Sequence, residues 1–143
     1  MTEKERKRRL KFPNTDTFNY VNVNPKGNLT TDCMVRAIVI TTGREYTDVV
    51  EDICRIACTQ YIGMCDKDML IKYMKRYHNI NKQNQIKKSD GTKITAAEFC
   101  KMFPKGKYIL KVTGHHITAV IDGKVQDHWD CTDKRVGNFW KVE

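Results

Sequence analysis

Residues 114–130 read GHHITAVIDGKVQDHWD, with two histidines before the dipeptide Asp122-Gly123 and two aspartates after it. An Asp-Gly pair between two strand-like segments is a strong signal for a two-residue β-hairpin turn. Such a turn pairs Ile121 with Lys124, and each step back along the first strand matches one step forward along the second. The stretch therefore predicts two antiparallel strands in a defined register.

The predicted register decides which histidine can meet which aspartate. Successive side chains of a strand point to opposite faces, so His116, Thr118 and Asp127 share one face. His115 and Asp130 lie directly across from each other on the other face. Two pairs are therefore geometrically open, His116 with Asp127 and His115 with Asp130, whereas a mixed pair would require a β-bulge.

Upstream of this hairpin the sequence pattern is helical. Apolar residues recur at helical spacing, and the Thr95 to Glu98 segment has the form of a capping box. Helices followed by an antiparallel sheet indicate the α+β class. The predicted elements are helices at 34–42, 48–61 and 67–77, a short helix that begins at 95 and is closed by Pro104, a polar loop at 78–92, and strands at 107–113, 115–121, 124–130 and 138–142.

The composition is that of one globular domain. The chain has 143 residues, of which 40% are hydrophobic and 30% charged. We expect a flexible basic tail at 1–11 and a single domain at 12–143. The net charge of +9 and a basic segment at 72–93 make nucleic-acid contact an alternative, although aromatic residues do not alternate with the basic ones. No apolar run approaches the roughly 20 residues of a membrane span and no secretory signal is evident, so we expect no membrane contact and a cytoplasmic location.

Cys33 stands apart from the other cysteines. The six cysteines lack the paired CxxC spacing of zinc sites, so no metal is expected. Disulfides are not expected in a chain without a signal peptide, and no cofactor is implied. Cys33, however, precedes the first predicted helix, where unpaired N–H groups and the helix dipole favour a thiolate. A nucleophile at a helix start, a histidine on a strand and an acid on the next strand are the parts of a thiol acyl-transfer site. On spacing alone, a hairpin whose polar side chains only face water is an equal alternative.

Two blocks of the sequence, NPKGNLTTDCMVRAIVITTG and GHHITAVIDGKVQDHWDCTDKRVGNFW, resemble small papain-like cysteine peptidases of Gram-positive bacteria and their phages. The peptidases that process bacteriocin leaders are nearest. The resemblance covers about Phe18 to Trp140 and implies a nucleophile helix packed on a C-terminal antiparallel sheet that carries the base. It implies Cys33 as the nucleophile, His116 as the general base and then acid, and Asp127 as the residue that orients His116. His115 and Asp130 remain the runner-up pair.

One position departs from the papain-like pattern. Such enzymes usually carry a glutamine six residues before the cysteine, where it donates a hydrogen bond to the transition-state oxyanion, but Gly27 stands there in this chain. Asn22, Asn24 or Asn28 could supply that donor, with the backbone N–H of Cys33 as the second one.

The expected function is a cysteine-dependent hydrolase of a peptide, isopeptide or other amide bond, acting on a peptide or protein substrate. If the chain is phage-encoded, it would act in the host cytoplasm. The alternative is a catalytically weak or silent papain-like scaffold that binds or inhibits a host protein. Its basic segments would then add nucleic-acid contact.

Overall fold

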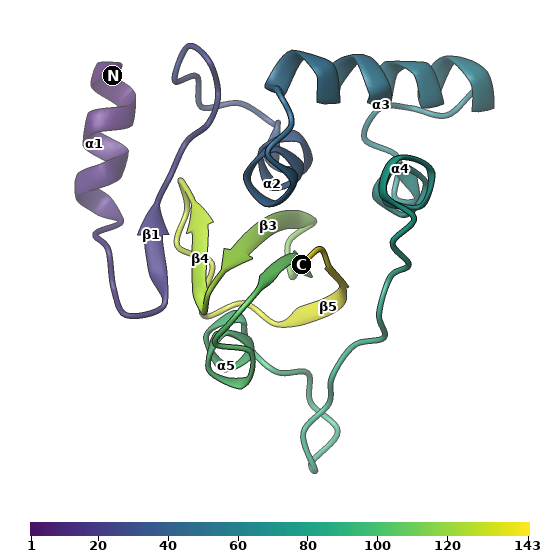
Figure 1. Cartoon of the computed structure of the whole chain (residues 1–143). Coiled ribbons are helices and arrows are strands. Elements are labelled where there is room, and N and C mark those ends of the chain that lie inside the picture. Colours follow the sequence, from purple (N-terminus) through teal and green to yellow (C-terminus); the bar gives the residue numbers. More distant parts are fainter.

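Five strands form one mixed sheet in the computed structural model, which describes residues 1–143 (Figure 1). The strand order is β1-β4-β3-β2-β5, in which β1 runs parallel to β4 and every other neighbouring pair is antiparallel. The strands are β1 (Phe18–Tyr20), β2 (Lys107–Val112), β3 (His116–Ile121), β4 (Lys124–Asp127) and β5 (Val136–Lys141).

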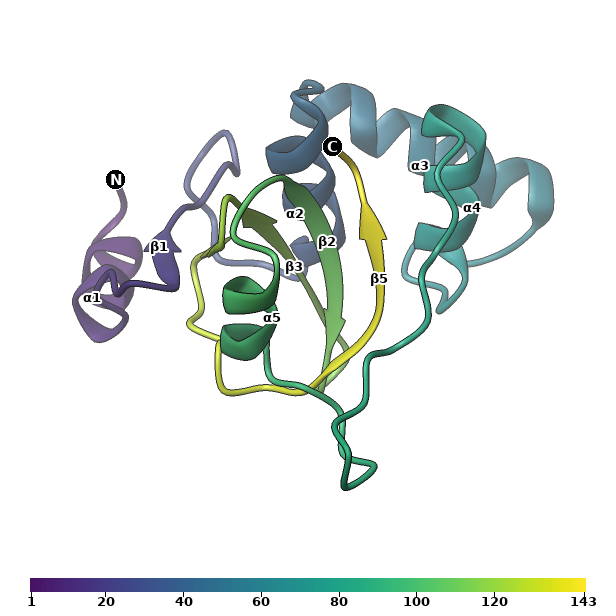
Figure 2. The same cartoon turned by 60° about the horizontal axis from the view of Figure 1, so that its bottom comes forward.

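Helices cover both faces of this sheet. Figures 1 and 2 show α2, with α3 and α4 beyond it, on one face and α5 on the opposite face. The α+β class is thereby confirmed. No helix combines the length and the apolarity that a membrane crossing requires. The helices are α1 (Glu3–Lys11), α2 (Cys33–Thr42), α3 (Tyr46–Gln60), α4 (Met69–His78) and α5 (Ala96–Met102).

Strand alternation divides the core into two clusters, one on each face. Ala119 of β3 is buried with the α2–α4 side, whereas its neighbour Val120 is buried with the α5 side. In the same way, Ile109 and Leu110 of β2 contribute to opposite clusters. A strand that is buried on both faces reads as a nearly continuous apolar run, which is the pattern of β2 and β3.

The hairpin of β3 and β4 has the predicted register. Ile121 pairs with Lys124, and Ala119 pairs with Gln126. Asp122 and Gly123 have φ values of 46° and 75°, the left-handed conformations that a type I′ turn requires. β4 ends at Asp127, earlier than the sequence predicts, because the Asp127 carboxylate accepts a hydrogen bond from the next backbone N–H and the chain bends there.

Strand β1 makes the sheet mixed, where the sequence predicts an antiparallel one. Phe18 pairs with Val125 and Tyr20 with Asp127 in parallel register. Both aromatic side chains are buried, at 0% and 8% exposure, in the cluster on the α5 face. Three residues are too few to show the alternation that marks a strand in a sequence, so the pattern alone does not reveal β1.

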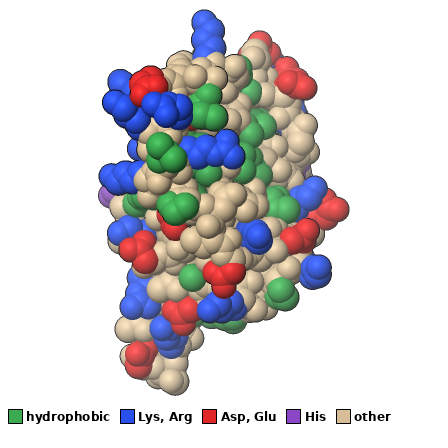
Figure 3. Space-filling model, turned by 90° about the vertical axis from the view of Figure 1, so that its left-hand side faces the viewer, with side chains coloured by type: hydrophobic (Ala, Val, Ile, Leu, Met, Phe, Trp, Pro, Cys, Tyr) green, Lys and Arg blue, Asp and Glu red, His purple; other side chains and the backbone are tan.

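The N-terminal segment forms a docked helix, α1, where the sequence predicts a flexible basic tail. The Thr2 hydroxyl accepts a hydrogen bond from the Glu5 N–H, and the basic side chains of the last turn complement the helix dipole. Arg8 Nε donates to the His128 carbonyl oxygen at 2.6 Å, which ties α1 to the chain beyond β4. Figure 3 shows Lys and Arg side chains gathered on this side of the molecule, with hydrophobic side chains between them.

Candidate active site

Cys33 is the first residue of α2, and its side chain is half-buried. The first hydrogen bond of the helix runs from the Arg36 N–H to the Asp32 carbonyl oxygen. The N–H groups of Cys33 and Met34 therefore have no acceptor within the helix, as is usual in a first turn. The thiol lies at the positive end of the helix dipole, beside free backbone donors.

His116 is the first residue of β3 and follows a tight turn. Gly114 and His115 both have positive φ values, of 91° and 57°, which reverse the chain after β2. The His116 side chain is 12% exposed, and its Nε2 lies 2.6 Å from Oδ2 of Asp127. This bond leaves Nδ1 as the ring nitrogen for a second partner. His116 also lowers the pKa of the Cys33 thiol.

Asp127 is the last residue of β4, and its side chain is only 1% exposed. Oδ2 accepts hydrogen bonds from the His116 ring and, at 2.7 Å, from the Thr118 hydroxyl. Oδ1 accepts at 2.7 Å from Nη1 of Arg36 and from the His128 backbone N–H. Four donors therefore hold the carboxylate in one orientation, as a residue that orients a catalytic histidine requires.

The charges of the site favour a thiolate and an imidazolium. Burial raises the pKa of the Cys33 thiol, but hydrogen bonds from His116 and the Ile117 N–H outweigh it, so the pKa lies below its ordinary value. Burial lowers the pKa of His116, but the hydrogen bond to Asp127 and contacts with the Cys131 and Cys33 thiols raise it to about 11. Since the thiolate is the nucleophilic form, the arrangement suits covalent catalysis.

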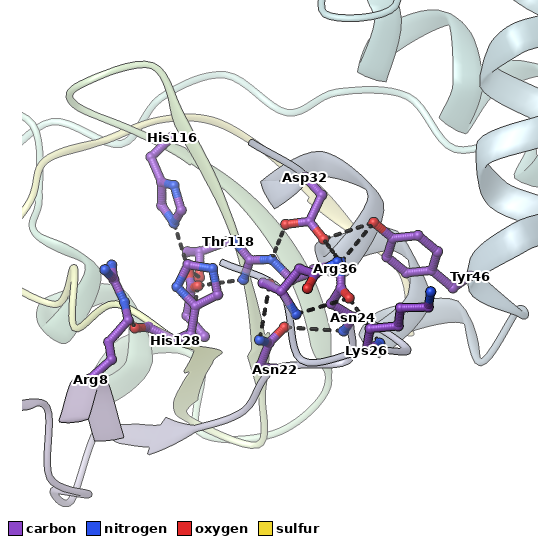
Figure 4. A network of polar contacts seen from close by, with 12 residues as sticks. Arg8, Asn22, Asn24, Lys26, Asp32, Arg36, Tyr46, His116, Thr118 and His128 are labelled. Carbon is purple, nitrogen blue, oxygen red and sulfur yellow. Dashed lines mark hydrogen bonds and ion pairs between the residues drawn. The ribbon is translucent and has the colours of Figure 1, made fainter. Parts of the chain in front are cut away.

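A buried arginine connects this site to the start of α2 (Figure 4). Arg36 donates from Nε to Asp32 at 2.8 Å and from Nη1 to Asp127 at 2.7 Å. Asp32 also accepts hydrogen bonds from the Tyr46 hydroxyl at 2.8 Å and from the Asn24 amide at 3.1 Å. Arg36 is a site residue that no motif in the sequence predicts, although an Asp and an Arg four residues apart are a recognisable helical ion pair.

Of the three asparagines that could complete the oxyanion hole, two have amides engaged elsewhere and the third is exposed. The Asn24 amide donates to Asp32, and its carbonyl oxygen accepts from the N–H groups of Lys26 and Asn28. The Asn22 amide donates to the Asn28 carbonyl oxygen at 3.3 Å. Asn28 itself is exposed. These contacts close the loop around Gly27, and none of the three asparagines lines the groove described below.

The runner-up pair does not form. His115 is exposed in the turn between β2 and β3, and no ion pair joins it to Asp130. Oδ1 of Asp130 instead accepts hydrogen bonds from the backbone N–H and the hydroxyl of Thr132. The left-handed turn at His115 moves its side chain out of the strand alternation on which the direct pairing depends.

Cys131 is a buried neighbour of the site that sequence reasoning does not single out. Its Sγ lies within 4.8 Å of donor atoms of His116 and Asp127, so the three side chains could in principle hold a cation. Two observations oppose this: Arg36 already neutralises the carboxylate, and burial raises the pKa of the Cys131 thiol. A metal would need a thiolate and free carboxylate lone pairs. The residues present therefore fit a hydrogen-bonded Cys–His–Asp group better than a metal centre.

A groove of about 1030 Å³ passes over Cys33 and His116. It extends around the turn between β2 and β3, since Ile117 and Val112 both line it and point to opposite faces of the sheet. Cys33, His116 and Trp129 lie in its wall. The rings of Trp129 and His116 form a T-shaped pair, with their centroids 4.8 Å apart. A chain laid in this groove would pass the thiol.

No family model, curated protein or solved structure matches the chain. The case for a function therefore rests on the geometry and the charges of the site.

Proposed function

We propose that this protein is a papain-like thiol hydrolase that cleaves a peptide, isopeptide or other amide bond. One observation carries the proposal: Cys33, at the start of a helix, lines the same groove as a histidine whose Nε2 lies 2.6 Å from a buried aspartate. His116 and Asp127 come from neighbouring strands, and Cys33 comes from the helix packed on them. In a surface hairpin whose polar side chains only face water, the Asp127 side chain would be exposed, whereas here it is buried.

The proposed reaction proceeds through an acyl-enzyme. The Cys33 thiolate attacks the carbonyl carbon, and the oxyanion that forms accepts hydrogen bonds from the free N–H groups at the start of α2. When the C–N bond breaks, His116 gives its proton to the leaving amine. A water molecule then loses a proton to neutral His116, attacks the thioester and releases the acid, which restores the thiolate and the imidazolium.

The proposal predicts how Cys33 reacts with iodoacetamide at different pH values. Because the pKa of Cys33 is lowered and that of His116 is raised, wild-type Cys33 should react rapidly well below pH 8. In His116→Ala the inflection should move to the ordinary thiol value near 8.5. Mass spectrometry of the digested protein measures each cysteine separately, which is needed because Cys54, Cys58 and Cys65 are exposed.

Cys58 serves as the reference thiol in the same samples, since it is exposed and lies outside the groove. Its pH profile should be the same in wild type and in His116→Ala. A wild-type Cys33 that titrates like Cys58 would contradict the hydrolase proposal.

The second candidate function is binding without turnover on the same scaffold. The observation in its favour is the engagement of the Asn22 and Asn24 amides within their own loop. Without a second oxyanion donor, the rate could fall roughly a hundredfold or more. One variant distinguishes the two candidate functions. Cys33→Ala should abolish the biological effect of a hydrolase, but it should leave the effect of a binding protein intact.

A further inference from the structure

We infer that the groove binds acidic peptides and places one large apolar side chain of the peptide beside the Cys33–His116 pair. The inference rests on the proposed hydrolase function, because it takes the groove as the substrate site. It adds the chemical class of the substrate. Two properties of the groove carry it, an apolar pocket next to the thiol and a set of unpaired cations around it.

The apolar pocket is built on the residues that follow the reactive ones. Met34 comes directly after Cys33 and Ile117 directly after His116, and both line the groove and pack against the core of the α2–α4 side. Ile53 of α3 and Leu70 of α4 line the groove from the same core. Met64 is 39% exposed at its edge. A surface of this kind gains free energy by covering an apolar side chain, at roughly 25 cal/mol for each Å² removed from water.

The charges around the pocket are almost all positive. Six cations line the groove, and all but Arg36 form no ion pair with an acid of the protein; these five are Arg8, Lys67, Lys93, Lys111 and Arg135. Three of these side chains donate only to backbone carbonyl oxygens. Of the two groove-lining aspartates, Asp32 is neutralised by Arg36, which leaves Asp66 as the free acid. A ligand whose charge complements this groove would therefore be negatively charged.

A peptide fits this groove better than a nucleic acid does. Single-stranded nucleic acids are bound by several aromatic side chains along a basic groove, on which successive bases stack. Here only two Tyr or Trp rings line the groove, Tyr46, whose hydroxyl is held by Asp32, and Trp129, whose ring forms a T-shaped pair with His116. The pocket beside the thiol is lined by aliphatic side chains and methionines, which suits a leucine-like group.

The test measures binding to the full-length Cys33→Ala protein, so that no peptide is consumed. Fluorescein-labelled 12-residue peptides carry a central Leu flanked by Glu and Asp. Three matched peptides replace the acids by Gln and Asn, the acids by Lys, or the Leu by Ala. Anisotropy should show the acidic Leu peptide binding at least about tenfold more tightly than each of the other three, with a loss of affinity between 50 and 200 mM salt.

Charge reversal in the groove provides the matched variant. Lys67 and Lys93 are exposed and make no side-chain hydrogen bond, so Lys67→Glu/Lys93→Glu should fold normally. We expect it to lose affinity for the acidic Leu peptide about tenfold or more. The control, Lys82→Glu/Lys101→Glu, changes the net charge by the same amount at exposed positions outside the groove. It should bind like its parent.

Three results would overturn the inference: equal binding of the neutral or basic peptide, equal loss of affinity in the control variant, or tighter binding of a single-stranded oligothymidine of similar charge. Failure of the hydrolase proposal looks different, because it appears in the pH profile of Cys33 alkylation. An ordinary thiol with intact selectivity for acidic Leu peptides would retain the groove assignment and reject turnover. A reactive Cys33 thiol without selectivity for acidic Leu peptides would retain the hydrolase proposal and reject the groove assignment.

Discussion

An Asp127→Asn variant is expected to hydrolyse its peptide substrate about 10⁴-fold more slowly than the wild type. Oδ2 of Asp127 lies 2.6 Å from Nε2 of His116, and the side chain is almost completely buried. A neutral amide stabilises the imidazolium less, and its N–H group opposes the tautomer of His116 that the reaction needs. The measurement is kcat on the acidic Leu peptide, with circular dichroism as the check that the variant is folded.

The same variant should change the pH at which Cys33 reacts. In the wild type, the hydrogen bond to Asp127 raises the pKa of His116, and His116 in turn lowers the pKa of Cys33. Without the carboxylate the imidazolium loses its proton at lower pH, so the thiolate forms only near the ordinary thiol value of about 8.5. A merely structural role would reduce the folded fraction but leave the inflection where it is. Asp130→Asn is the control and should match the wild type.

An Arg36→Met variant is expected to lower the free energy of unfolding by about 3–5 kcal/mol. The Arg36 side chain is 3% exposed and contacts the carboxylates of Asp32 and Asp127 at 2.8 and 2.7 Å. Methionine occupies a similar volume but leaves both buried carboxylates without a cation. Urea unfolding measures the loss. In Arg55→Met, which removes a 57% exposed side chain 3.6 Å from Asp52, the change should be within about 1 kcal/mol.

The loss in Arg36→Met should depend on pH. Burial raises the pKa values of Asp32 and Asp127, but hydrogen bonds and ion pairs outweigh it and hold both below the ordinary carboxyl value. Stability that arises from a lowered carboxyl pKa is present above about 3.9 and disappears as the pH falls through the lower folded values. Arg36→Met lacks this contribution, so its deficit should narrow below about pH 4. A deficit of equal size at pH 3 and pH 7 would assign the loss to packing.

Local patterns predicted the parts of the fold that local physics controls. Asp122-Gly123 and the strand-like segments on either side of it led to the observed register, because a two-residue turn leaves only one way to align its strands. Gly43, in the left-handed conformation at φ 74°, ends α2, and the capping box opens α5. The segments that local patterns describe poorly are the short strand β1 and the helix α1, whose places depend on contacts with distant residues.

The sequence by itself determined which histidine could share a strand face with which aspartate, and that Cys33 stands at the start of a helix. Tertiary structure alone decided how these residues are used. Arg36 and Asp127 are separated by 91 positions yet share a buried ion pair. The Asn24 amide, a candidate oxyanion donor from the sequence, donates instead to Asp32, because folding brings that carboxylate within 3.1 Å. Turn and strand geometry are determined by a few neighbouring residues. The hydrogen-bond partner of a side chain depends instead on which distant groups the packed core brings within reach.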